Sequence, residues 1–152
     1  MRTEFIPVKW EGDLKPVLEK LDLPKRVGLI SNLQFIDHLK ELESYLNEKG
    51  IETYNGGQVL GCNTTEPLKI DNQVDAYLFL GSGEFHPLEV LEKTKKPVFL
   101  VNPETQNITK VTEEDLIKYN KKIIQNARQT DTDFEKALKY CIKNKFNINF
   151  SW

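Results

Sequence analysis

The sequence predicts an α/β fold, a three-layer sandwich in which helices cover both faces of a mostly parallel sheet of four to five strands. Two observations predict it. Short continuous apolar runs recur along the chain, as expected of strands that are buried on both faces. Between these runs, apolar residues recur at helical spacing, and strands that alternate with helices form parallel βαβ units. Rossmann-like and flavodoxin-like folds share this organisation.

The N-terminal part of the chain supplies a strand, a helix and a second strand. Residues 5–8 form a short apolar run with β character. Asp13 offers an N-cap oxygen to a helix that extends to Leu21, and Pro16 is tolerated because it falls in the first turn. Residues 26–30, with the sequence RVGLI, then predict a strand buried on both faces.

The next helix is predicted over residues 35–49. One face of it carries apolar residues at intervals of four, three and four, namely Phe35, Leu39, Leu42 and Leu46. Gly50 suits the position just after a helix, so the helix is expected to end there. Extended structure resumes at 51–54 and is followed by the glycine-rich segment 55–63, NGGQVLGCN.

The same alternation continues in the second half of the chain. AYLFL at 76–80 is a buried-strand run, GSGEFHP at 81–87 is a predicted turn, and residues 88–93 form a short helix. VFLV at 98–101 is another buried strand, closed by Asn-Pro at 102–103. Because ligands bind beyond the carboxyl ends of parallel strands, both glycine-rich segments are expected at that edge, side by side.

The C-terminal part is predicted to be mainly helical. Thr112 and Asp115 have the spacing of a capping box, which indicates a helix that begins at residue 112. Residues 130–133 break this stretch, a second helix runs to about Asn144, and residues 146–150 alternate like an edge strand. The chain contains no linker or internal repeat, so one domain is expected over residues 1–152.

Composition excludes several classes of protein. The 152 residues include 21 Lys and Arg against 23 Asp and Glu, a net charge of −2, which argues against a strongly basic nucleic-acid binder. No apolar run approaches the roughly 18 residues of a membrane span, and the start of the chain does not resemble a secretory signal. The two cysteines are expected to be free thiols in the reducing cytoplasm, because they cannot form a disulfide framework.

The segment 55–63 is the first candidate site. Gly61 immediately precedes Cys62, so the sulfur is expected on an open turn at the loop edge and not inside a strand. Two interpretations remain open, a thiolate that acts as metal ligand or nucleophile and a small apolar residue in a turn. Zinc is disfavoured because no CxxC or HxxxH motif accompanies this cysteine. Cys141 has helical spacing from its apolar neighbours, which favours a structural thiol.

The segment 81–87 is the second candidate. Gly81 and Gly83 follow a buried strand, where backbone amides can hold a phosphate or carboxylate, but the third glycine of a dinucleotide fingerprint is missing. His86 is either a general acid or base or a packed, turn-capping residue. His38 lies next to a core position and is expected on a helix flank. The sequence contains no HExxH or GxxxxGK[ST] motif and suggests no Ser-His-Asp arrangement.

Four segments together resemble the central domain of the diphthamide synthase family. They are RVGLISNLQFIDHL, GGQVLGCN, VDAYLFLGSGEFHPLEV and KKPVFLVNPET, in the family's order and with similar gaps. The resemblance extends from about Phe5 to Asn149. It implies a relation to enzymes that make 2-(3-amino-3-carboxypropyl)histidine on translation elongation factor 2, from S-adenosylmethionine and with a [4Fe–4S] cluster held by one cysteine from each of three similar domains.

The resemblance assigns residues as well as an activity. Cys62 corresponds to the cluster ligand of the middle domain, and the cofactor-binding residues that it implies are Gly57, Gln58, Gly61, Gly81, Gly83 and His86. Cys141 matches neither of the other two cysteine motifs, so the chain alone is expected to be inactive. It is then a subunit of a split enzyme, an excised domain or a degenerate relative. The expected partners are other diphthamide synthase domains or subunits and the elongation factor.

Two other functions stay open at this point. The chain is alternatively a non-catalytic scaffold or binding subunit of the same pathway, with Cys62 unused. A third interpretation is a domain that binds a small anionic ligand at 81–87.

Overall fold

The computed structural model describes residues 9–60 and 64–129. The chain divides into two compact units, residues 1–113 and residues 114–152. The first unit carries the sheet, and the described part of the second lies in one helix, α5 (Glu113–Gln129). The single domain expected over residues 1–152 stays a prediction.

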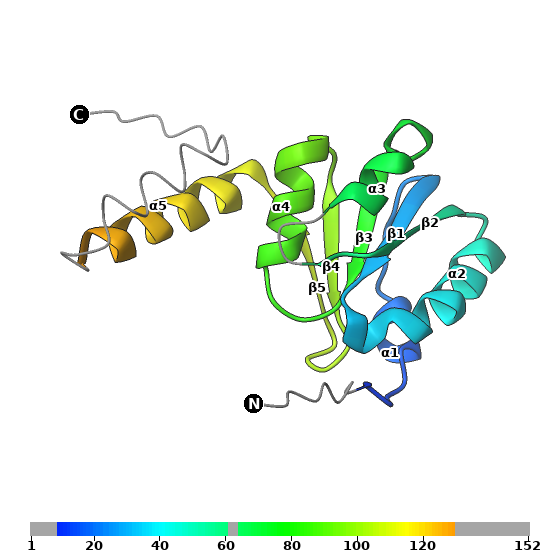
Figure 1. Ribbon diagram of the computed structural model, residues 1–152. Coiled ribbons are helices and arrows are strands. Elements are labelled where there is room, and N and C mark those ends of the chain that lie inside the picture. Colours follow the sequence, from blue (N-terminus) through cyan, green and yellow to red (C-terminus); the bar gives the residue numbers. More distant parts are fainter. Residues whose placement is uncertain (1–8, 61–63, 130–152) are drawn as a thin grey trace, which may run out of the picture. The chain divides into compact units, whose positions relative to one another are not determined.

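The first unit is built on a five-stranded sheet with the order β2-β1-β3-β4-β5 (Figure 1). The first four strands of the chain are parallel, and the last pairs antiparallel with β4. Their bounds are β1 (Arg26–Ser31), β2 (Glu52–Gln58), β3 (Ala76–Leu80), β4 (Val98–Asn102) and β5 (Asn107–Val111). The predicted α/β fold with a mostly parallel sheet is therefore confirmed.

Helices cover both faces of this sheet (Figure 1). One face packs against α1 (Lys15–Leu18), η1 (Leu33–His38) and α2 (Leu39–Glu48), and its core comprises Leu14, Val17, Leu18, Val27, Leu29, Phe35, Leu39, Leu42, Leu46, Leu78, Leu80 and Val101. Successive strand residues point to opposite faces, so Tyr77 and Phe79 lie on the other face. That face is covered by α3 (Thr65–Lys69), η2 (Asp71–Gln73) and α4 (Phe85–Thr94).

Several predicted elements agree closely with the structure. The strand at 76–80 has the predicted bounds, and β1 and β4 are each one residue longer than predicted. The helix expected at 35–49 begins as the 3₁₀ helix η1 and continues as α2, and Gly50 follows it with φ +78°. The helix near residue 13 is shorter than expected. Asp13 Oδ1 accepts a hydrogen bond from the Lys15 amide at 2.9 Å, but Leu14 holds the N-cap position.

The glycine-rich segment 55–63 differs from its prediction as a loop, because its first four residues belong to β2. The register slips between Leu29 and Ile30, so that Gly56 is an extra residue opposite β1. A Cβ on Gly56 would lie 2.6 Å from Ile30 Cγ2, and Gly57 has φ +70°. The glycines therefore form a β-bulge that continues the strand.

Other differences lie at short elements. Residues 85–87 form the first turn of α4, where a turn was expected, and β5, α3 and η2 have no counterpart among the predicted elements. The predicted strands at 5–8 and 146–150, the break at 130–133 and the helix to Asn144 lie outside the described residues.

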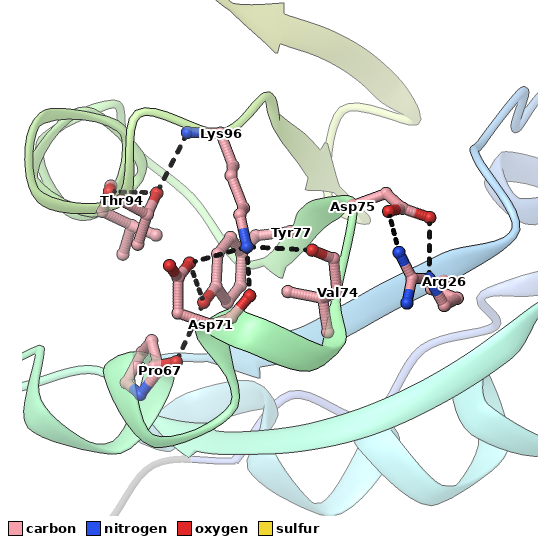
Figure 2. A network of polar contacts seen from close by, with 9 residues as sticks. Arg26, Pro67, Asp71, Val74, Asp75, Tyr77, Thr94 and Lys96 are labelled. Carbon is pink, nitrogen blue, oxygen red and sulfur yellow. Dashed lines mark hydrogen bonds and ion pairs between the residues drawn. The ribbon is translucent and has the colours of Figure 1, made fainter.

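A buried tyrosine ties α3 and η2 to the sheet (Figure 2). Tyr77 is fully buried, and its hydroxyl oxygen lies 2.9 Å from the Pro67 carbonyl oxygen and 3.0 Å from Asp71 Oδ1. The single hydroxyl proton is shared between these two acceptors. Burial, with the Asp71 carboxylate beside it, raises the pKa of Tyr77 above that of an ordinary tyrosine, so the hydroxyl stays a donor.

Lys96, two residues before β4, completes this network (Figure 2). Its ammonium donates to the carbonyl oxygens of Asp71 and Val74, the latter at 2.9 Å, and lies 3.2 Å from the Asp71 carboxylate. Three acceptors match the three protons of an ammonium group.

Arg26 and Asp75 form an ion pair at the same edge, at 2.6 Å, and the hydrogen bond from Arg26 lowers the pKa of the Asp75 carboxyl. The segment that contains α3 and η2 and leads to the amino end of β3 is thus held to β1, to β3 and to the residues before β4.

We expect Tyr77→Phe to lower the free energy of unfolding by about 1–2 kcal/mol, because the buried Pro67 carbonyl loses its hydroxyl donor. Tyr54→Phe is the matched control, since the Tyr54 hydroxyl donates to the exposed Glu52 carboxylate and is expected to contribute close to nothing. Urea unfolding followed by circular dichroism measures both variants. Equal losses in the two variants would contradict a special role for the Tyr77 network.

Candidate functional site

The candidate site lies at the carboxyl edge of the parallel strands. Ser31, the last residue of β1, pairs with Gln58 at the end of β2 and with Leu80 at the end of β3. The Val59 amide donates to the Ser31 carbonyl at 2.8 Å, and the Gly81 amide donates to the Val101 carbonyl at 3.0 Å. The two glycine-rich segments thus leave the same edge on either side of β1, roughly 10 Å apart at the usual strand spacing.

The cysteine segment is described on both sides of Cys62. Gly57 and Gln58 lie at the end of β2, and Val59 is 1% exposed. On the far side, Thr64 is 2% exposed and precedes α3. Gly61 and Cys62 themselves lie outside the described residues, as does Cys141. The chain is therefore buried immediately before and shortly after the segment that carries the candidate ligand, while Leu60 is exposed.

Thr64 carries an unusual hydroxyl group. Its Oγ1 is buried and has no hydrogen-bond partner among the described residues. Thr64 also occupies the N-cap position of α3 without making a side-chain capping bond. A buried hydroxyl without a partner is costly, and in a native protein it calls for an explanation such as an ion or ligand. The sequence analysis does not name Thr64 as a candidate. The feature of the sequence that could have identified Thr64 is its position two residues after Cys62.

Gly81 gives room to a neighbouring loop. A Cβ on Gly81 would lie 2.8 Å from Cε1 of Phe79 and 3.3 Å from Cγ of Asn32, the residue that follows β1. Asn32 Oδ1 is, like Thr64 Oγ1, buried without a partner in the described part of the chain. Gly81 therefore permits the loops after β1 and β3 to approach each other. Gly83 lies in the turn that follows, before α4.

His86 lies in the first turn of α4 and packs against aromatic rings. Its imidazole stacks on Phe79 at a centroid distance of 5.8 Å and an interplanar angle of 12°, and it meets Phe85 edge-on at 5.3 Å. Burial lowers the pKa of His86, although the nearby Glu89 carboxylate opposes this effect. The geometry thus provides a neutral ring that braces the start of α4 against β3. It favours the packed interpretation of His86 over the acid–base interpretation.

His38 has a structural environment. Its Nε2 donates to the Trp10 carbonyl at 2.8 Å, its Nδ1 lies 3.4 Å from Glu41, and its ring meets the Trp10 indole edge-on at 5.0 Å. These contacts hold residue 10 against the end of η1. The expectation that His38 flanks the core is in keeping with this position.

Within residues 9–60 and 64–129, no three His, Cys, Asp or Glu side chains are grouped so that they could bind a metal ion. None of the helices in this part of the chain has the length and apolar character that crossing a membrane requires.

Comparison with known proteins identifies relatives of the whole sheet unit. Residues 1–133 match the protein family described as "Putative diphthamide synthesis protein". The chain is 31% identical over 135 residues to the 2-(3-amino-3-carboxypropyl)histidine synthase of Methanocaldococcus jannaschii and 32% identical over 118 residues to that of Pyrococcus horikoshii. These matches cover 82% and 72% of this chain but 35% and 33% of the relatives. The chain thus spans about a third of the length of the curated relatives it matches.

Solved structures agree with this relationship. The crystal structure of Dph2 from Pyrococcus horikoshii superimposes with a TM-score of 0.63 and 29% identity, over 75% of this chain and 37% of that one. The structure of the same protein with a 4Fe-4S cluster gives a TM-score of 0.59 and 32% identity, over 69% and 33% of the two chains. The sequence match and the shared fold lead to the same conclusion: this chain belongs to the diphthamide synthesis protein family.

Proposed function

We propose that this chain acts in diphthamide biosynthesis by supplying one thiolate, that of Cys62, to a [4Fe–4S] cluster that other domains or subunits complete. The observation that carries the proposal is the position of residues 56–60, the described part of the GGQVLGC segment, which leave β2 at the carboxyl edge inside the region matched by the family. A relative with the same fold has been crystallised with such a cluster.

The residues of the chain fit one ligand position of this cluster and no more. Cysteine thiolates are the ordinary ligands of iron–sulfur clusters, and a cluster of four irons needs about four of them, or three with a substrate on the last iron. The chain has two cysteines, and Cys141 lies in the other unit. The remaining ligands must therefore come from other polypeptide, and the isolated chain should be inactive.

When bound, the cluster would supply the electron for reductive cleavage of S-adenosylmethionine, and the 3-amino-3-carboxypropyl group would go to a histidine of translation elongation factor 2. The residues of this chain hold and orient the ligand. Val59 and Thr64 fix the polypeptide on the two sides of Cys62, because both are buried. We assign the contacts with S-adenosylmethionine to His86 and to backbone amides and small residues of the two glycine-rich segments. These residues are Gly57, Gln58, Gly61, Gly81 and Gly83.

Thr64 has a proposed electronic role in this arrangement. Its hydroxyl lies two residues from Cys62 and has no partner among the described residues, so it is available to donate to a sulfur atom of the site. Hydrogen bonds to sulfur stabilise the more negative, reduced form of a cluster and raise its reduction potential.

A scaffold that leaves Cys62 unused is the alternative within the same pathway. It predicts that complexes with the partner polypeptide form with equal affinity whether or not residue 62 is a cysteine. Substitution of Cys62 therefore separates the two functions.

We expect Cys62→Ala to abolish or severely destabilise the cluster in anaerobic reconstitution with the missing domains supplied in trans, whereas Cys141→Ala leaves it intact. The physical reason is the loss of one of three protein ligands in the first variant only. Absorbance in the visible region and iron content measure the cluster. A full-strength cluster in the Cys62→Ala assembly that still modifies the elongation factor would establish the scaffold instead.

We expect Thr64→Val to lower the reduction potential of the assembled cluster by roughly 20–60 mV, the equivalent of one hydrogen bond of about 0.5–1.5 kcal/mol. In the isolated chain the same change should be neutral or stabilising, because it removes a buried hydroxyl that has no partner. Thr109→Val, on the exposed surface of β5, is the control for both measurements. An unchanged potential in Thr64→Val would contradict a hydrogen bond to the cluster.

We expect His86→Phe to weaken the pH dependence of stability. Because burial lowers the pKa of folded His86, the unfolded chain binds more protons below the ordinary value of about 6.5, and stability falls as the pH is lowered through that value. Phenylalanine keeps the stacking on Phe79 but takes up no proton. Urea midpoints at about pH 7.5 and pH 5 should differ less in the variant than in the parent chain, since only the parent gains a charge at position 86 in this window. Identical pH profiles would show that His86 is not held neutral.

A further inference from the structure

The chain contains one Asn-Gly pair, Asn55-Gly56, in the second half of β2. In such a pair the main-chain nitrogen of the glycine can attack the side-chain carbonyl carbon of the asparagine, and no side chain on the glycine hinders the approach. Asn55 is exposed, so that water can reach its side chain and ammonia can leave it. The pair is therefore a place where the chain can modify itself.

The β-bulge in β2 gives the glycine of this pair conformational freedom. The register slips between Leu29 and Ile30, and Gly56 has no partner in β1. The extra residue of a bulge lies outside the regular hydrogen-bond ladder, which is disrupted locally. In a regular paired strand, ladder bonds on both sides of an asparagine would keep the next main-chain nitrogen from turning toward the side chain. The bulge removes this restraint at Gly56.

The Gly57 amide acts on the other reacting group. It donates a hydrogen bond to Asn55 Oδ1 at 2.8 Å, which folds the side chain back over the Gly56 peptide. Gly57 makes this contact with φ +70°, a conformation that favours glycine. The bond places a donor on the oxygen atom that gains negative charge when a nucleophile adds to the carbonyl carbon. Nucleophile, carbonyl carbon and donor are thus brought together by three consecutive residues.

We propose that Asn55 is a site of spontaneous deamidation through a cyclic imide with Gly56, promoted by the β-bulge. The Gly56 nitrogen forms a bond to Asn55 Cγ, the Cγ–Nδ2 bond breaks, and the Gly56 amide proton leaves with the side-chain nitrogen as ammonia. Water, the one co-reactant, then opens the imide. Opening at the side-chain carbonyl carbon gives aspartate. Opening at the main-chain carbonyl carbon gives isoaspartate, in which the chain continues through the former side chain.

The two products differ in their effect on the sheet. Aspartate adds a negative charge at an exposed position and leaves the main chain unchanged. Isoaspartate adds a carbon atom to the main chain just before the place where Gln58 pairs with Ser31. A longer main chain cannot keep this register, so the isoaspartate form is expected to be less stable and the aspartate form is not.

Incubation of the full chain in neutral buffer, followed by proteolysis and mass spectrometry, tests the proposal. We expect Asn55 to be converted to both products. Asn102 is a matched control, because its Oδ1 also accepts a hydrogen bond from the amide two residues later, at 3.0 Å, but the nitrogen of Pro103 carries no proton. Asn107, exposed in β5 and followed by isoleucine, is the control for exposure. Neither control should be converted.

Two results of this measurement overturn the proposal. One is conversion of Asn55 that is no faster than that of Asn107. The other is conversion to aspartate alone, because direct hydrolysis of the side chain gives that product without an imide.

Glu48→Gly separates the effect of the bulge from that of the Asn-Gly sequence. The variant has a second Asn-Gly pair, Asn47 and the new glycine, at exposed positions in the last turn of α2. The attacking amide there belongs to the helical hydrogen-bond pattern and has to be released first. We expect Asn47 to be converted roughly tenfold more slowly than Asn55 in the same molecule, the cost of about one backbone hydrogen bond. Equal rates overturn the proposal, and so does a rate for Asn55 that rises when the parent chain is unfolded in urea.

Melting temperatures of the separated products complete the test. The isoaspartate form should melt below the fresh chain, and Asn55→Asp, which reproduces the other product, should melt close to it. Equal melting of all three would overturn the expected loss of register in β2. The reaction uses neither a metal nor a partner polypeptide, so its failure would leave the proposed role of Cys62 standing, and the reverse holds as well.

Discussion

The position of β1 between two parallel partners is the constraint on which the rest of the structure depends. Ser31 pairs with Gln58 on one side and Leu80 on the other, so the chain must leave β2 and β3 at the same edge. Burial enforces this arrangement on both faces. Val27 and Leu29 pack under η1 and α2, while Gly28 leaves space for Tyr77, whose ring a Cβ would approach to 2.8 Å. The juxtaposition of the two glycine-rich segments thus follows from packing at the centre of the sheet.

The two edges of the sheet divide stability and proposed function between them. At the amino edge three charged groups have close partners, because Lys96 has three acceptors and Arg26 pairs with Asp75. At the carboxyl edge, Asn32 and Thr64 keep buried oxygen atoms without partners in the described part of the chain. Departures from full polar satisfaction are expected where a protein binds something. The network of Tyr77, Asp71 and Lys96 at the amino edge fixes α3. Because α3 follows the segment that carries Cys62, the network also anchors one end of that segment.

Sequence patterns predicted the elements whose stability is local or whose burial is complete. β3 could be predicted to the residue because AYLFL is buried throughout, and α2 could be located from the spacing of Leu39, Leu42 and Leu46. β5 could not, because NITKV is a short edge strand that exists through its pairing with β4. α3 is likewise too short to be recognised from its period, and it depends on the hydrogen bond from Tyr77 to Pro67. Each of these two elements depends on a tertiary contact, which the local sequence pattern does not reveal.

The same limit applies to the candidate site. The carboxyl edge at which Val59 and Gly81 leave the strands could be predicted, but the packing of His86 on Phe79 and the burial of Thr64 depend on tertiary contacts, which a linear pattern does not contain. Small metal domains that hold every ligand of their metal can leave folding to the metal. A domain that holds one ligand cannot, because a single thiolate recruits no cluster by itself. Its loop has to be positioned by protein contacts alone, and the buried Val59 and Thr64, with the Tyr77 network behind α3, provide them.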